Sequence, residues 1–177
     1  MVCVQNPGAG QGFNGCSVVH THMTNSRITD PEVLEWRFPV LLSEFLIRAQ
    51  SGGQGRWHGG DGVVRRIRFL EPMKAGILFG CRVIPPFGLN GGIAGKPGVN
   101  RVIHGDGQVE VIPGCAEIEM KAGDQFQIET PGEGDSARSG GAALFTGEQW
   151  SLRYQKSQLQ RYYNSVERRC MPPRKAD

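Results

Sequence analysis

The sequence predicts a β-rich α+β fold, in which a short N-terminal helix precedes a small antiparallel sandwich or barrel. Glycine supplies 26 of the 177 residues, mostly in pairs and Gly-x-Gly spacings, which indicates many tight turns. Several short apolar segments lie between these turns, and one clear helix start precedes them. A chain of this length can bury one core, so we expect one domain with an appendage.

The predicted helix begins at Thr29 or Asp30. Either side chain can accept hydrogen bonds from the free backbone N–H groups of a first helical turn, where Pro31 is tolerated. Pro39 interferes with continuation of the helix, so we expect it to end at about Phe38.

Period-two alternation of apolar and polar residues predicts strands after the helix. The alternation is partial over residues 44–48 and becomes clearer near Arg66, Ile67 and Arg68. Turn-forming residues separate the later segments, as at 105–107 and 121–124. The predicted strands cover residues 44–48, 63–69, 75–79, 99–103, 109–112, 116–119 and 125–129.

Charge divides the chain into two parts. Residues 1–135 carry 12 Lys and Arg against 14 Asp and Glu, a balance of −2, whereas residues 136–177 carry 8 against 3, a balance of +5. We therefore predict a domain over 1–135 and a divergent basic tail over 136–177, partly helical or disordered. Apolar residues recur every seven positions at Leu152, Leu159 and Val166, which makes a C-terminal helix possible.

Several classes of protein are disfavoured by composition. Five cysteines at wide spacings, with no Cys-x-x-Cys pair, support neither a zinc site nor a disulfide framework and fit a cytoplasmic protein. No apolar run reaches the ~18 to 20 residues of a membrane span. A net charge of +3 is too small to imply nucleic acid, and the basic strand with Arg65, Arg66 and Arg68 lacks interleaved aromatic residues. We interpret that strand as solvated or partner-facing.

The polar run from His20 to Pro31 is the strongest candidate for a functional site. His20 and His22 alternate, so on an extended segment they would point the same way and could share proton transfer or metal binding. Two imidazoles are an incomplete metal site, and the alternatives are a structural or substrate-pocket hydrogen-bonding role, or simple exposure. Asp30 could complete it, but a helix cap explains Asp30 equally well, so we assign no metal ligand.

Asn25 and Arg27 in the same run suit a substrate that carries an amide and a carboxylate. An amide side chain offers both a donor and an acceptor, and a guanidinium group binds a carboxylate with two parallel hydrogen bonds. The alternative is that both residues hold the loop to neighbouring strands. Asp61, between two glycines, resembles a catalytic carboxylate, yet a turn aspartate that accepts backbone N–H groups is the better interpretation.

An ordered series of motifs resembles the C-terminal part of the hydantoinase B/5-oxoprolinase family. The series comprises His20–Glu32 (His-Thr-His-Met-Thr-Asn-Ser-Arg-Ile-Thr-Asp-Pro-Glu), Arg37–Val40, Ser51–Arg56, Gly60–Arg65, Pro86–Gly92 and Ala122–Asp124. The resemblance covers roughly residues 8 to 132. It stops near Gly132, where the family typically continues with further glycines and this chain has Glu133-Gly134-Asp135. Because composition and charge change at the same place, we hypothesise a replaced C-terminus, for example by a shifted reading frame.

The resemblance implies ATP-dependent opening of a cyclic amide such as 5-oxoproline or a hydantoin. It implies that the lactam oxygen is phosphorylated at a hydantoinase A region, which makes the amide a better electrophile, and that hydantoinase B assists hydrolysis. The full enzyme would use ATP and a divalent metal, and its partners would be the hydantoinase A region and the missing part of hydantoinase B. This chain is then a fragment, with His20 and His22 as catalytic and Asn25 and Arg27 as substrate-binding candidates. The alternative is a stand-alone β module for binding or assembly without catalytic activity.

Overall fold

The computed structural model describes residues 8–19 and 28–136. The predicted C-terminal helix and basic tail therefore lie outside the described residues, except for Ser136. Among the described residues the elements are α1 (Pro31–Arg37), β1 (Val40–Arg48), β2 (Gly62–Phe69), β3 (Met73–Leu78), β4 (Val99–Ile103), β5 (Val109–Ile112), β6 (Cys115–Met120) and β7 (Gln125–Glu129). Each predicted strand corresponds to one of these.

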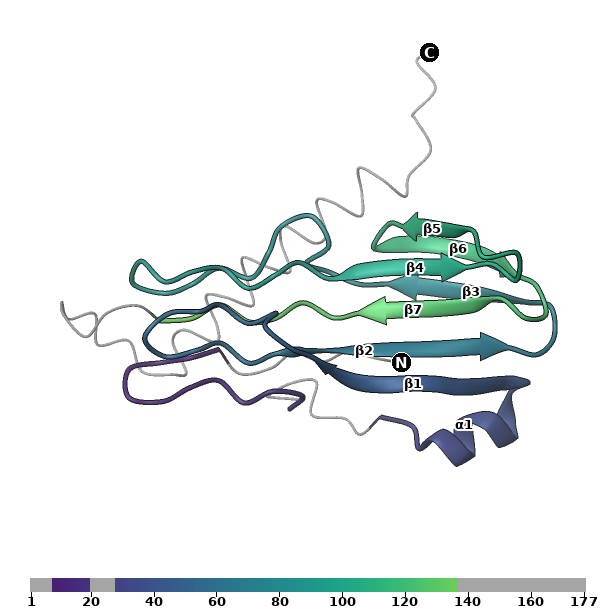
Figure 1. Ribbon diagram of the computed structural model, residues 1–177, viewed down its shortest axis with the longest axis horizontal. Helices are drawn as coiled ribbons and strands as arrows, with labels where there is room; N and C mark the ends of the chain where they lie inside the picture. Colours follow the sequence, from purple (N-terminus) through teal and green to yellow (C-terminus); the bar gives the residue numbers. More distant parts are fainter. Residues whose placement is uncertain (1–7, 20–27, 137–177) are drawn as a thin grey trace, which may run out of the picture. The chain divides into compact units, whose positions relative to one another are not determined.

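The strands form two antiparallel sheets (Figure 1). Five strands follow the order β1-β2-β7-β4-β5, and β3 pairs with β6 in a separate two-stranded sheet. Apolar residues from both sheets meet in one core: Val40, Val63, Phe69, Ile77, Val102, Ile112, Met120, Phe126 and Ile128. The larger sheet keeps two open edges, β1 and β5, so the predicted sandwich is confirmed and a closed barrel is not formed.

The helix begins and ends where the sequence predicts. Asp30 is its N-cap, and one carboxylate oxygen accepts a hydrogen bond from Glu32 N at 2.9 Å. Phe38 is the C-cap in an extended conformation, before Pro39. The helix lies against the edge of the larger sheet, where Glu35 Oε1 accepts from Leu42 N at 2.8 Å (Figure 1). Asp30 thus has the capping role that the sequence offers for it, and it contributes no evidence for a metal site.

Strand β2 departs from the expected basic, solvated character. Arg68 is exposed, and Arg66 is half-buried and hydrogen-bonded to Gln127 Oε1 at 2.7 Å. Arg65, however, is only 3% exposed, because it lies on the same face of the sheet as the buried Ile128, its partner on β7. Burial lowers the pKa of Arg65. Arg65 is therefore not solvated, whereas the alternative of a partner-facing strand stays a prediction.

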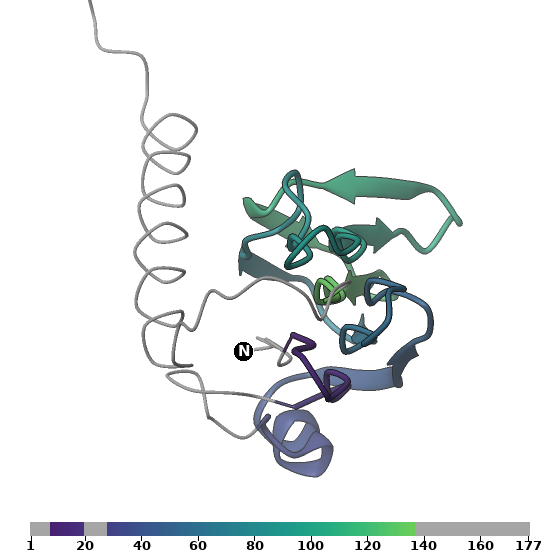
Figure 2. The same ribbon diagram turned by 90° about the vertical axis from the view of Figure 1, so that its left-hand side faces the viewer.

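Beyond one end of the larger sheet, two loops that fold back on themselves lie beside the segment that follows β7 (Figure 1). We call residues 51–60, 86–96 and 130–136 the loop bundle. Each part is bonded to the other two: Gly53 N donates to Glu133 O at 2.8 Å, Gly132 N donates to Lys96 O at 3.1 Å, and Lys96 N donates to Ser51 O at 2.7 Å. Figure 2 shows these segments nearly end-on. Their lateral hydrogen bonds satisfy the backbone without a regular sheet.

Glycine is required at several positions of the loop bundle because neighbouring backbones approach closely. A Cβ at Gly132 would overlap the carbonyl group of Ser51, and one at Gly95 would overlap that of Gly132. Gly92, Gly95 and Gly98 recur every third residue, which matches the three residues per turn of an extended polyproline-type helix. A Cβ at each of these three positions would lie within 3 Å of a backbone oxygen, so glycine is required where the chains touch.

Replacement of Gly132 by Ala should destabilise the protein by about 3 kcal/mol or more, since the added methyl group overlaps backbone atoms rather than a flexible side chain. Gly76→Ala on β3 is the matched control, because nothing lies within 4 Å of a Cβ there. Its effect should be within about 1 kcal/mol and in the stabilising direction. Urea unfolding of both variants, followed by circular dichroism, measures the two changes; equal effects would contradict the close-packed bundle.

Candidate functional site

The four predicted site residues, His20, His22, Asn25 and Arg27, lie in the segment 20–27, outside the described residues. Their roles as catalytic and substrate-binding groups therefore stay predictions. The structure does describe the chain on both sides of this segment, up to Val19 and again from Ile28.

The chain before the segment is attached to the loop that joins β1 and β2. Asn14 Oδ1 accepts a hydrogen bond from His58 N at 2.9 Å, and Gly15 N donates to His58 O at 2.8 Å. Three residues later, Ser17 Oγ accepts from Asp61 N at 2.9 Å. These contacts fix the start of the candidate segment beside the glycine-rich 58–62 stretch. After the segment, the cap on Asp30 fixes the start of α1.

Asp61 has a structural role, as the turn interpretation predicts. Its Oδ1 accepts from the backbone N–H groups of Ser51 and Gly52, both at 2.8 Å. Ser51 in turn accepts with its Oγ from Gly62 N at 2.8 Å. The carboxylate thereby closes the loop between β1 and β2 at the point where β2 begins. The same aspartate contributes its N–H to Ser17, so it links the loop to the N-terminal segment.

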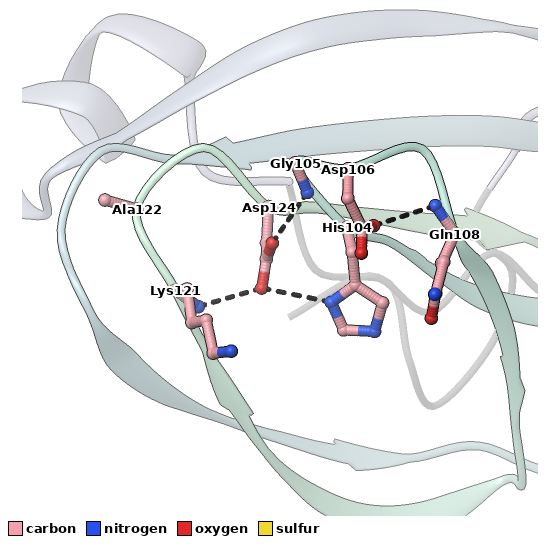
Figure 3. Close-up of a pocket in the computed structure, with 7 residues that line it drawn as sticks. All are labelled: His104, Gly105, Asp106, Gln108, Lys121, Ala122 and Asp124. Atoms are coloured by element: carbon pink, nitrogen blue, oxygen red, sulfur yellow. Dashed lines mark hydrogen bonds and ion pairs between the residues drawn. The ribbon is translucent and has the colours of Figure 1, made fainter.

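An open hollow of about 380 Å³ lies at the other end of the sheet, between the β4–β5 turn and the β6–β7 turn (Figure 3). Its ionisable lining residues are His104, Asp106, Lys121 and Asp124. His104 Nδ1 lies 3.4 Å from Asp124 Oδ2, and His104 Nε2 lies 3.8 Å from a carboxylate oxygen of Glu110. His104 and Asp124 differ in burial: the Asp124 side chain is 4% exposed and that of His104 is 30% exposed.

Asp124 holds the two turns together. Its carboxylate accepts from Lys121 N at 2.9 Å and from Gly105 N at 3.0 Å, in addition to His104. Burial by itself raises the pKa of this carboxyl, but the two backbone hydrogen bonds and His104 outweigh that effect, so the pKa of Asp124 is lowered. A buried carboxylate satisfied by backbone donors is a structural anchor, and we assign the hollow no catalytic role.

The sequence did not predict this pair. Both turns were recognised from their glycine and aspartate residues, but residues 104 and 124 are brought together by the pairing of Ile103 with Gln125 between β4 and β7. Those two strands are far apart in the sequence, and their neighbourhood depends on the strand order. The one available signal in the sequence was an aspartate, Asp124, at the end of a turn before a strand. This signal did not identify His104 as its partner.

Replacement of Asp124 by Asn should lower the free energy of unfolding by about 2 kcal/mol at pH 7. The reason is that a neutral amide oxygen forms weaker hydrogen bonds with the two backbone donors and with His104 than a carboxylate does. The lowered pKa gives the sign of the pH effect: the carboxylate's contribution is present above the unfolded-state pKa of about 3.9 and is lost as the pH falls through the lower folded-state pKa. The difference between wild type and variant should therefore shrink on acidification below about pH 4.

Thermal unfolding of wild type and Asp124→Asn between pH 2.5 and 7 measures this dependence. Asp106→Asn is the control, since Asp106 is exposed in the same β4–β5 turn and its carboxylate accepts from a neighbouring backbone group, Gln108 N. A pH-independent difference for Asp124→Asn would contradict the anchoring role.

The described part of the chain has neither a metal-ligand cluster nor a membrane-spanning helix. Residues 8–19 and 28–136 contain no group of three or more His, Cys, Asp or Glu side chains placed to hold a metal ion. Within the same ranges, no helix is both long enough and apolar enough to cross a membrane.

The chain is similar to several 5-oxoprolinases. It is 48% identical to 5-oxoprolinase 1 of Arabidopsis thaliana and 44% identical to 5-oxoprolinase of Dictyostelium discoideum, in each case over 127 residues. Each match covers 72% of this chain and 10% of the relative, so the chain spans about a tenth of the length of the curated relatives it matches.

A solved structure shares the fold. The ATP-dependent caprolactamase from Pseudomonas jessenii superposes with a TM-score of 0.63 and 23% sequence identity, over 75% of this chain and 24% of that one. At this identity the likeness concerns the fold alone. The model of the hydantoinase B/oxoprolinase family matches residues 2–135, which includes the whole described fold apart from Ser136. The chain belongs to the hydantoinase B/oxoprolinase family.

Proposed function

We propose that this chain is part of an ATP-dependent cyclic-amide hydrolase of the 5-oxoprolinase or N-methylhydantoinase type, and that it does not turn over substrate alone. The observation that carries the proposal is the identity of 44–48% with 5-oxoprolinases over a stretch that makes up a tenth of their length. A domain that spans so small a share of its relatives holds only some of the groups that the whole reaction needs.

In the proposed assembly, a hydantoinase A-type region supplies ATP chemistry and the rest of hydantoinase B completes the pocket. ATP and a divalent metal belong to that assembly. The described residues of this chain do not fit a resident metal, because they lack three clustered ligands, and we route no step through a metal here. The contribution of this chain is the segment 20–27, whose entry is fixed by Ser17 and whose exit is fixed by the cap on Asp30.

Within that segment we propose distinct tasks for the four side chains. Asn25 and Arg27 bind the amide and the carboxylate of the substrate, since they offer matching donors and acceptors. His20 and His22 move protons when the activated amide is attacked by water and its C–N bond breaks, because imidazole titrates near neutral pH. The chain on both sides of the segment is held, by Ser17 and by the cap on Asp30, which suits a task that depends on positioning.

The dependence on other parts of the enzyme can be tested by complementation. The purified chain alone should show no 5-oxoproline-dependent ATP hydrolysis, whereas addition of Arabidopsis 5-oxoprolinase 1 from which the matching stretch has been deleted should restore it. Turnover by the chain alone would contradict the proposal of an incomplete enzyme. Binding without restored turnover would favour the alternative of an assembly module.

In the complemented enzyme, His22→Ala should lower kcat by at least about 100-fold, the usual contribution of a general acid or base. His58→Ala is the control, since His58 is exposed and contacts Asn14 and Gly15 through its backbone, and its loss should change kcat less than about twofold. Steady-state kinetics with 5-oxoproline compare the two. Unchanged kcat and unchanged KM for His22→Ala would remove this residue from the pocket.

A further inference from the structure

At the β1 edge of the larger sheet, α1 and β1 expose several large apolar side chains. We call Val33, Trp36, Phe38, Phe45 and Ile47 the α1–β1 surface. Trp36 is 85% exposed, and Phe45 and Ile47 are 45% and 53% exposed. Large exposed apolar side chains on two elements in contact are typical of an interaction site rather than of a solvated surface.

Both faces of β1 are apolar near its C-terminal end. Phe45, Leu46 and Ile47 are consecutive, so their side chains alternate between the two faces of the sheet, and all three are exposed. Strands that read as continuous apolar runs are normally covered on both faces. β1 also pairs with a neighbour on one side alone among the described strands, which leaves backbone groups of its outer edge available.

Arg65 places a buried positive charge next to this surface. Phe45 is its cross-strand partner on β1, so the two side chains lie on the same face of the sheet. Arg65 is 3% exposed, and its Nε has no hydrogen-bond partner in the described part of the chain. A buried guanidinium N–H without an acceptor is costly, whereas a carboxylate brought against it would form a charge-assisted pair.

We propose that the α1–β1 surface docks the remainder of the hydantoinase B region, through a segment that covers Phe45 and Ile47 with apolar side chains and pairs a carboxylate with Arg65. The inference rests on the proposed function, since it names the surface through which the chain joins the rest of the enzyme. Two observations favour this occupant: the relatives carry most of their length outside the matched stretch, and the patch combines apolar residues with one unmatched positive charge.

The probe for the test is Arabidopsis 5-oxoprolinase 1 lacking the stretch that this chain matches, with the full 177-residue chain as the other component. Isothermal titration calorimetry should detect binding of the wild-type chain. Arg65→Met should weaken it by at least about 30-fold, since the partner carboxylate would lose its buried cation. Arg68→Met is the matched control, because Arg68 is exposed on the same strand and points to the other face; it should change affinity less than about threefold.

Two further variants test the apolar part of the surface. Phe45→Lys should abolish detectable binding, because it places a second positive charge beside Arg65 in an interface that becomes desolvated. Val111→Lys introduces the same side chain at an exposed position of β5, at the opposite edge of the sheet, and should bind like wild type. Circular dichroism of all four variants should show the wild-type fold.

The outcomes separate the docking surface from the proposed function. Binding of the wild-type chain with equal affinity for all four variants would overturn the docking surface and leave the proposed function standing. No binding to a truncated relative shown to be folded would count against both. A free chain that sediments as a dimer, and as a monomer after Phe45→Lys, would assign the surface to a second copy and overturn the inference.

Hydrogen exchange on the free chain keeps the inference testable if the truncated relative does not fold. With the α1–β1 surface uncovered, outer-edge amides of β1 should exchange far faster than those of the central strand β7, which is hydrogen-bonded on both sides. Equal protection of β1 and β7 in a monomeric chain would mean that another segment of the same chain covers the surface, and it would overturn the proposal.

Discussion

The fold depends on the close approach of backbones in the loop bundle. The 130–136 segment continues β7 beyond the sheet and is hydrogen-bonded to both other parts of the bundle, so it joins strands that are distant in the sequence. Thr130 Oγ1 accepts from Val63 N at 2.7 Å, which ties the first residue of this segment to the start of β2. A side chain at Gly132 or Gly95 would push these backbones apart. The glycine content of the chain is therefore a packing requirement rather than a sign of loose loops.

This packing also determines where the candidate site segment begins. Asp61 uses its carboxylate to close the β1–β2 loop on Ser51 and uses its N–H to hold Ser17. The chain that enters residues 20–27 is thus attached to a part of the molecule that is itself held by the loop bundle. The proposed proton transfer would need such support, because small displacements of proton-transfer groups strongly reduce rates. The glycine motifs are in this way connected to the chain that precedes the histidine motif.

Local signals in the sequence were sufficient for the helix and for all the strands. The cap at Asp30, the break at Pro39 and the period-two segments each act over a few residues, and the structure follows them. Two features depended on strand order and could not be predicted: the pairing of His104 with Asp124 and the burial of Arg65. An arginine in a polar, arginine-rich strand gives no local sign that its face of the sheet is covered. The candidate site residues were predicted from motif resemblance, which gives identity but no geometry.

The position of Arg65 can be understood by comparing the two ends of the strand order. Towards β4 and β5 the core face is covered by β3 and β6, and apolar residues such as Val102 and Met120 are fully buried there. Towards β1 the covering is incomplete, and Phe45 and Ile47 remain partly in solvent. Arg65 lies at this boundary, where it is desolvated but has no acceptor in the described residues. A buried charge of this kind destabilises an isolated domain, but it favours a partner that brings a carboxylate over one that is merely apolar. Arg65 thus lowers the stability of the isolated domain and at the same time favours a partner that carries a carboxylate.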